Sequence, residues 1–178
     1  GIGGNYILHE YQERSKEKEL ELDDHKELVK RQEESAINAF QLLGEAHYSA
    51  IALNKLAQSA PPPGLTQAQI DLHQKNNELI WSRSSDFLER WEKEKTPTGM
   101  RLFYFYEGDR VLTAWVRVKE AGDQMLKAAL NRVLMRMASP GAPLPRTSPQ
   151  GEAQEEQKFD DAVNDLCRVL EQAHRANK

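Results

Sequence analysis

Apolar residues recur every three or four positions through four long segments, which is the spacing of one face of an α-helix. The first segment, residues 5–58, has no proline and a single glycine, Gly44, so nothing in it forbids one continuous helix. At about 1.5 Å per residue, such a helix is roughly 80 Å long. Its apolar residues are dense from Leu28 onward, whereas residues 9–27 are nearly all charged or polar. The pattern predicts a long helix whose first part has few apolar side chains to bury.

A seam of positions alternately three and four residues apart runs through this segment without a break. The seam is polar at Ser15, Lys18, His25 and Gln32 and becomes mostly apolar beyond them. We expect residues 1–27 to project as a charged helical stalk, continuous with the next helix, and residues 28–178 to form a helical bundle. The candidate stalk contacts are the other seam residues of this part together with its histidine: Leu8, Tyr11, Leu22 and His25.

Proline and glycine separate the remaining segments. Residues 61–64 read Pro-Pro-Pro-Gly and end the first helix, and Thr66 with Gln69 forms a capping box that starts the second. Residues 96–99, Thr-Pro-Thr-Gly, are expected to end the second helix. The expected helices span about 28–58, 66–95, 109–138 and 150–174, with a proline-rich loop at 139–149.

Stripes of this width with short connections predict an all-α protein, an antiparallel four-helix bundle with an extended, charged N-terminal helix. An alternative remains for residues 101–118, which are rich in aromatic and β-branched residues and could form a β-hairpin in an α+β fold. The helical interpretation is favoured because an apolar stripe continues from Val111 to Val133. Residues 100–108 are then the first turns of the third helix or an extended lead-in. The small residues Gly108, Gly122 and Ala129 are expected to allow close approach of another helix.

Composition and charge narrow the classes of function. Hydrophobic residues make up 39% and charged residues 29% of the chain, which suits exposed helices better than a large α/β enzyme. The net charge of −4 argues against a general nucleic-acid binder. Residues 97–150 carry 8 basic and 4 acidic side chains between acidic neighbours, which we attribute to complementary packing within the bundle. Cys167 is the single cysteine, so an internal disulfide and a cysteine-built zinc site are excluded.

Reactive side chains do not form a recognisable set. Glu171 and His174 have the Glu-x-x-His spacing, but a di-iron bundle needs two such motifs and the chain has one. His47 and Cys167 lie beside predicted seams, where an ordinary packed side chain explains them. We therefore expect no catalytic residue, no metal and no cofactor, and hence a non-enzymatic protein.

A group of aromatic side chains with nearby arginines is the more distinctive set. One interpretation is that the rings close one end of the bundle; another is an aromatic pocket or contact surface with arginine at its rim. The candidate residues are Trp81, Trp91, Phe103, Tyr104, Tyr106, Arg110 and Trp115.

These patterns favour a helical-bundle interaction or assembly module that contacts a protein partner, or a second copy, through its N-terminal helix. Because the charged helix starts just after Gly-Ile-Gly-Gly, one form of this hypothesis makes the chain the soluble portion of a membrane-anchored protein. The membrane would then be reached only through a segment absent from this chain, and the composition by itself favours no compartment. The alternative function is a ligand-sensing bundle, with an aromatic pocket between the second and third helices near Trp81, Trp91, Tyr104 and Trp115.

Overall fold

The computed structural model describes the backbone of residues 2–140 and 149–176; the side chains of residues 2–8, 11 and 149–150 lie outside the description. Within these ranges the protein consists of four α-helices and contains no strand. The helices are α1 (Ile2–Gln58), α2 (Gln67–Tyr106), α3 (Asp109–Ala138) and α4 (Pro149–Ala176). The predicted all-α class and the helical bundle are confirmed.

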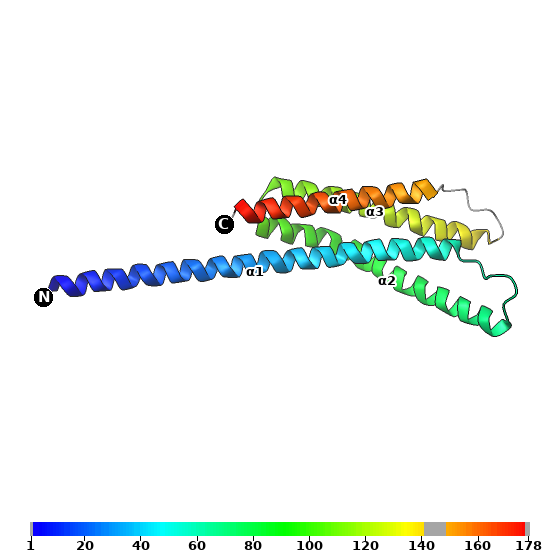
Figure 1. Ribbon diagram of the computed structural model, residues 1–178, viewed down its shortest axis with the longest axis horizontal. Coiled ribbons are helices and arrows are strands. Elements are labelled where there is room, and N and C mark those ends of the chain that lie inside the picture. Colours follow the sequence, from blue (N-terminus) through cyan, green and yellow to red (C-terminus); the bar gives the residue numbers. More distant parts are fainter. Residues whose placement is uncertain (1, 141–148, 177–178) are drawn as a thin grey trace.

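The third helix is at the centre of the bundle. It packs against each of the other three helices, whereas α4 lies almost entirely on α3, and α1 packs on α2 and α3. Figure 1 shows the chain reversing its direction along the long axis at each connection, and the N-terminal half of α1 extending well beyond the other helices. At the end of the molecule away from the stalk, the first half of α2 diverges from α1.

The core is formed by the helical stripes that the sequence pattern predicts. The seam of α1 is buried from Gln32 onward except at the half-buried Ala36, and the stripe of α3 from Val111 to Val133 is buried along its length. The largest fully buried apolar side chains come from all four helices: Leu43, Leu53, Trp91, Leu102, Val111, Val118, Met125, Leu126, Phe159 and Leu166. Burying such side chains stabilises the fold by roughly 1.5–3 kcal/mol each, so the bundle stability comes mainly from this shared core.

The second helix differs from the prediction at its C-terminal end. It begins with the predicted capping box of Thr66 and Gln69, but it continues through Pro97 to Tyr106 instead of ending near residue 95. Proline removes one backbone donor, and in the same turn Trp115 donates its indole N–H to the carbonyl oxygen of Lys95 at 2.8 Å. Leu102 is buried two turns from the expected end. Tertiary packing therefore outweighs the local preference of the proline to end the helix.

The β-hairpin alternative for residues 101–118 is wrong. Residues 101–106 form the last turns of α2 and residues 109–118 the first turns of α3. Only Glu107 and Gly108 separate the two helices, and Glu107 ends α2 in the left-handed conformation with φ 44°. The expectation that residues 100–108 lead into the third helix is wrong for the same reason, since most of them belong to α2.

Candidate interaction surfaces

The stalk, residues 2–27 of α1, is exposed wherever its side chains are described. Ion pairs between successive turns support it: Glu10 with Arg14 at 2.8 Å and Asp23 with Lys26 at 3.9 Å. Each exposed pair of this kind contributes a few tenths of a kcal/mol at most. The side chains of the candidate contacts Leu8 and Tyr11 lie outside the described residues, whereas those of Leu22 and His25 face solvent.

A fixed junction joins α1 to the end of the bundle. Gln32 is 1% exposed and donates from Nε2 to the carbonyl oxygen of Phe105 at 2.8 Å. Tyr106 donates its hydroxyl to the carbonyl oxygen of Gln32 at 3.1 Å. Burial, together with the negative charge of Glu33, raises the pKa of Tyr106 above its ordinary value. The last turn of α2 therefore holds α1 at the point from which the stalk projects.

The seam crosses this junction and continues on the stalk. On the bundle side it is covered by α2 and α3, from Gln32 to Leu53. On the stalk side Val29 is half-buried and Leu22 is 52% exposed. The same face of α1 is therefore packed against α2 and α3 within the bundle and exposed to solvent along the stalk.

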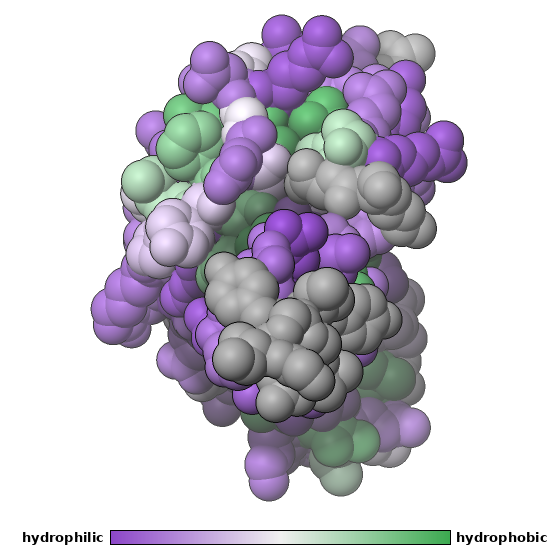
Figure 2. Space-filling view, turned by 90° about the vertical axis from the view of Figure 1, so that its left-hand side faces the viewer, coloured by the Kyte–Doolittle hydropathy of each residue, from purple (hydrophilic) through white to green (hydrophobic). Residues whose placement is uncertain are grey.

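Apolar side chains are also exposed at this end of the bundle. Figure 2 looks along the stalk and shows hydrophobic surface above it, scattered among polar side chains. Tyr104 is 73% exposed and its ring lies edge-on to that of Phe105. Phe103 is half-buried beside them, and Met100 is exposed one turn earlier. These side chains lie on the last turns of α2, next to the junction that holds Gln32.

Two of the three tryptophans of the aromatic set lie in the core. Trp91 is 1% exposed and donates from Nε1 to Asp123 at 2.7 Å; Trp115 is equally buried and donates to Lys95. Each indole lies against a glycine of the opposite helix, Trp91 on Gly122 and Trp115 on Gly99. The sequence predicts the close approach at Gly122, whereas at Gly99 it predicts a helix end that the structure does not have.

Lys95 connects the two tryptophan contacts. Its Nζ lies 2.9 Å from Asp123, the acceptor of Trp91, while its carbonyl oxygen accepts from Trp115. Partial burial lowers the pKa of Lys95, but the hydrogen bonds to Glu92 and Asp123 outweigh it, so the net shift is upward. The sequence contains no periodic signal for this cluster, because its members come from both helices and one contact uses a main-chain atom.

Trp81 and Arg110 lie outside this cluster of tryptophans and glycines. Arg110 is exposed at the start of α3, beside a shallow hollow between α3 and α4. Trp81 is half-buried and lines a trough of about 610 Å³ where α2 diverges from the ends of α1 and α3. The structure therefore does not bring Trp81 together with Trp91, Tyr104 and Trp115 around one cavity.

The trough has both apolar and polar walls. Leu56, Trp81, Val133 and Met137 supply apolar surface, and Ser59, Gln74, Asn77 and Glu78 supply polar groups. Ser59 hydrogen-bonds His73 Nε2 at 2.9 Å and also contacts Asn77. These bonds tie the end of α1 to α2 across the proline-rich connection.

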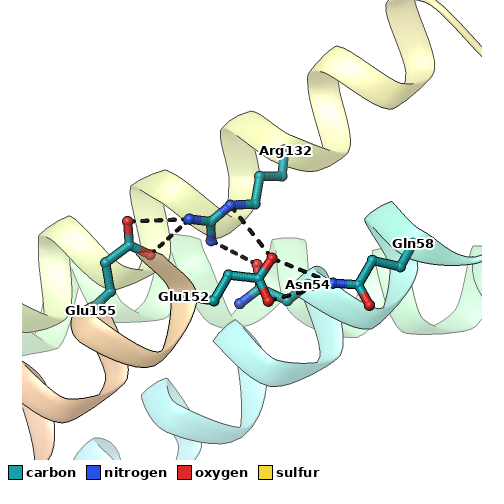
Figure 3. Close-up of polar contacts among 5 residues, drawn as sticks. All are labelled: Asn54, Gln58, Arg132, Glu152 and Glu155. Carbon is teal, nitrogen blue, oxygen red and sulfur yellow. Dashed lines mark hydrogen bonds and ion pairs between the residues drawn. The ribbon is translucent and has the colours of Figure 1, made fainter. Parts of the chain in front are cut away.

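A buried arginine joins α1, α3 and α4 at the end of the bundle away from the stalk (Figure 3). Arg132 of α3 donates to Asn54 of α1 at 3.0 Å and to both carboxylate oxygens of Glu155 of α4 at 3.1 and 3.2 Å. Its Nε lies 3.8 Å from Glu152, within ion-pair distance but beyond a hydrogen bond. This contact explains part of the basic character of the third helix as packing against acidic neighbours.

The described residues contain no group of three or more His, Cys, Asp or Glu side chains arranged to hold a metal ion. Cys167 is half-buried, with Sγ 3.9 Å from Glu171, and His47 contacts Asp160 and the ring of Phe159. In the described part of the chain, no helix is both long and apolar enough to cross a membrane.

Comparison of the chain with protein-family models, with curated proteins and with solved structures gives no match. The geometry of these surfaces therefore carries the functional argument.

Proposed function

We propose that the protein is a helix-pairing assembly module, which contacts a protein partner through the open seam of its stalk. One observation carries the proposal: the seam that α2 and α3 cover on the bundle side of Gln32 continues, in the same helix and the same phase, along a stalk whose described side chains are exposed. A heptad spacing of seam residues is the pattern by which one helix packs against another. Its continuation beyond the last packing contact in the bundle therefore supports a second helix packing on the stalk.

A photo-crosslinking amino acid at single stalk positions tests this proposal in the cells that produce the protein. Position 22 lies on the seam, whereas position 20 lies on the opposite face and is also exposed, at 64%. We expect crosslinked products from position 22 and markedly fewer from position 20. Equal yields from both positions, or none from position 22, would show that the seam contacts no partner.

A second candidate function is ligand sensing in the trough beside Trp81. It is supported by the volume of about 610 Å³, within the range of small-molecule sites, and by walls of mixed polarity. Ligand binding would change the emission of the half-exposed Trp81 and leave the buried Trp91 and Trp115 unchanged. A metabolite screen read by fluorescence, repeated on Trp81→Phe, isolates that signal. A response that persists in Trp81→Phe would place the ligand elsewhere.

A further inference from the structure

We infer that the partner of the stalk is the stalk of a second copy, paired antiparallel along the seam, with Arg14 of each copy beside Glu21 of the other. The inference rests on the proposed helix-pairing function and specifies its partner. It follows from the shape of α1 and from the charges on one flank of the seam.

The shape of the molecule decides the direction of pairing. α1 is one helix from Ile2 to Gln58, and beyond Gln32 its seam is covered by α2 and α3. In a parallel pair, each α1 would continue through the volume that α2 and α3 of the other copy occupy. In an antiparallel pair, each stalk runs toward the end of the other bundle, and the two bundles lie at opposite ends of the pair.

Charge decides the register. Arg14 and Glu21 each come one residue before a seam position, Ser15 and Leu22, so both lie on the same flank of the seam. In an antiparallel pair, equal flanks face each other. When Leu22 lies level with residue 11 of the other copy, Arg14, which is paired with Glu10 of its own exposed helix face, also faces Glu21 of the other copy. The two-fold symmetry creates two such contacts.

The neighbouring registers are excluded by the same residues. A shift of one heptad in one direction brings Glu21 beside Glu21 and drives residues 2–10 of each copy alongside residues 30–38, where the bundle begins. A shift in the other direction brings Arg14 beside Arg14. Of these three registers, only the middle one avoids both like-charge contacts.

The middle of this interface is polar, because Ser15 of each copy lies level with Lys18 of the other. Polar seam residues lower the stability of a coiled coil while specifying its register. The pairing is therefore reversible and sensitive to salt, since the flanking ion pairs are exposed and screened.

Sedimentation equilibrium of the full chain over a wide concentration range tests the inference. We expect a monomer–dimer equilibrium in low salt whose dimer fraction falls as salt is raised. Leu22→Ser should weaken dimerisation roughly tenfold or more, because both copies lose the apolar contact. The matched control Leu20→Ser, on the opposite face, should change it less than about twofold.

Charge exchange tests orientation. Arg14→Glu and Glu21→Arg each create two like-charge contacts and should weaken the dimer, whereas the double variant R14E/E21R restores opposite charges and should recover it. In a parallel pair these residues would instead face Glu19 and Lys26, so the double variant would be the weakest of all. Failure of the double variant to recover overturns the antiparallel register.

A chain that stays monomeric at every salt and protein concentration overturns self-pairing. If crosslinks from position 22 then lead to a different protein, the proposed helix-pairing function stands and only the identity of the partner is wrong. Absence of crosslinks from position 22 overturns both.

Discussion

The indole of Trp115 lies so close to Gly99 that a Cβ atom built on the glycine would come within 2.0 Å of the ring carbon Cδ1. The opposite helix repeats the arrangement, since a Cβ on Gly122 would lie 2.8 Å from Trp91. Two tryptophans thus pack on two glycines across the α2–α3 interface. Asp123 accepts a hydrogen bond from the indole of Trp91, and the carbonyl oxygen of Lys95 accepts one from the indole of Trp115. The side chains of Lys95 and Asp123 also contact each other. This interface positions the last turns of α2, and through them the junction with the stalk.

Gly99→Ala should destabilise the protein by about 2 kcal/mol or more, because the added methyl group collides with the buried ring of Trp115. Gly44→Ala is the matched control: it also lies inside a helix, but nothing is found within 4 Å of its added Cβ. The control should be neutral or stabilising by up to about 1 kcal/mol, as alanine favours the helix. Urea denaturation measures both, and equal effects would mean that the Trp115 contact is not tight.

The buried charge at Arg132 should make its partner more important than the arginine itself. Glu155→Ala removes two of the three hydrogen bonds of a buried guanidinium and should cost about 2–4 kcal/mol. Arg132→Met leaves carboxylates that are partly exposed and can be hydrated, so its cost should be smaller, about 1 kcal/mol. Gln58→Ala, which removes only a long, exposed contact to Glu152, serves as the control. Urea denaturation ranks the three variants, and a reversed order of the first two would contradict this account.

Stability should fall at alkaline pH. The pKa values of Lys95 and Tyr106 are both raised in the folded protein above the ordinary 10.5 and 10.0. A raised folded pKa means that the contribution is complete below the unfolded value and is lost as pH rises through the folded value. The urea midpoint should therefore decrease above about pH 10. Tyr106→Phe removes one of these two groups, so the urea midpoint of this variant should decrease less steeply with pH. An unchanged dependence of the midpoint on pH would mean that Tyr106 does not contribute to the loss of stability.

Removal of the stalk should leave the bundle folded. A chain that begins at Leu28 retains Gln32 and every core residue, and loses only a segment whose described side chains are exposed. We expect its melting temperature, measured at a concentration where the full chain is monomeric, to stay within about 2 °C. A fall of many degrees would show that the stalk is part of the cooperative unit.

Much of the fold follows from the spacing of apolar residues. The seam of α1, the stripe of α3 from Val111 to Val133 and the cap at Thr66 are local patterns, and each has the structure that its period or its hydrogen-bonding chemistry predicts. The misjudged element is residues 96–106. There a proline and a glycine indicate an end, and the aromatic run that follows has no helical stripe of its own.

The candidate sites divide in the same way. The open seam at Leu22 and His25 could be located from the sequence, because heptad phase and charge are properties of a single helix. The positions of the aromatic residues could not. Trp91 and Trp115 are core residues because glycines on the opposite helix make room for them, and Trp81 lines a trough because α2 diverges from α1.

The sequence by itself determined that the chain is helical, where its long apolar stripes lie, and that the first part of α1 has few apolar side chains to bury. The tertiary structure decided that α2 passes through Pro97, that Arg132 is buried among carboxylates, and that the open seam adjoins the end of the bundle. The physical reason is that periodicity is a property of one helix, whereas these features depend on which atoms of two helices meet.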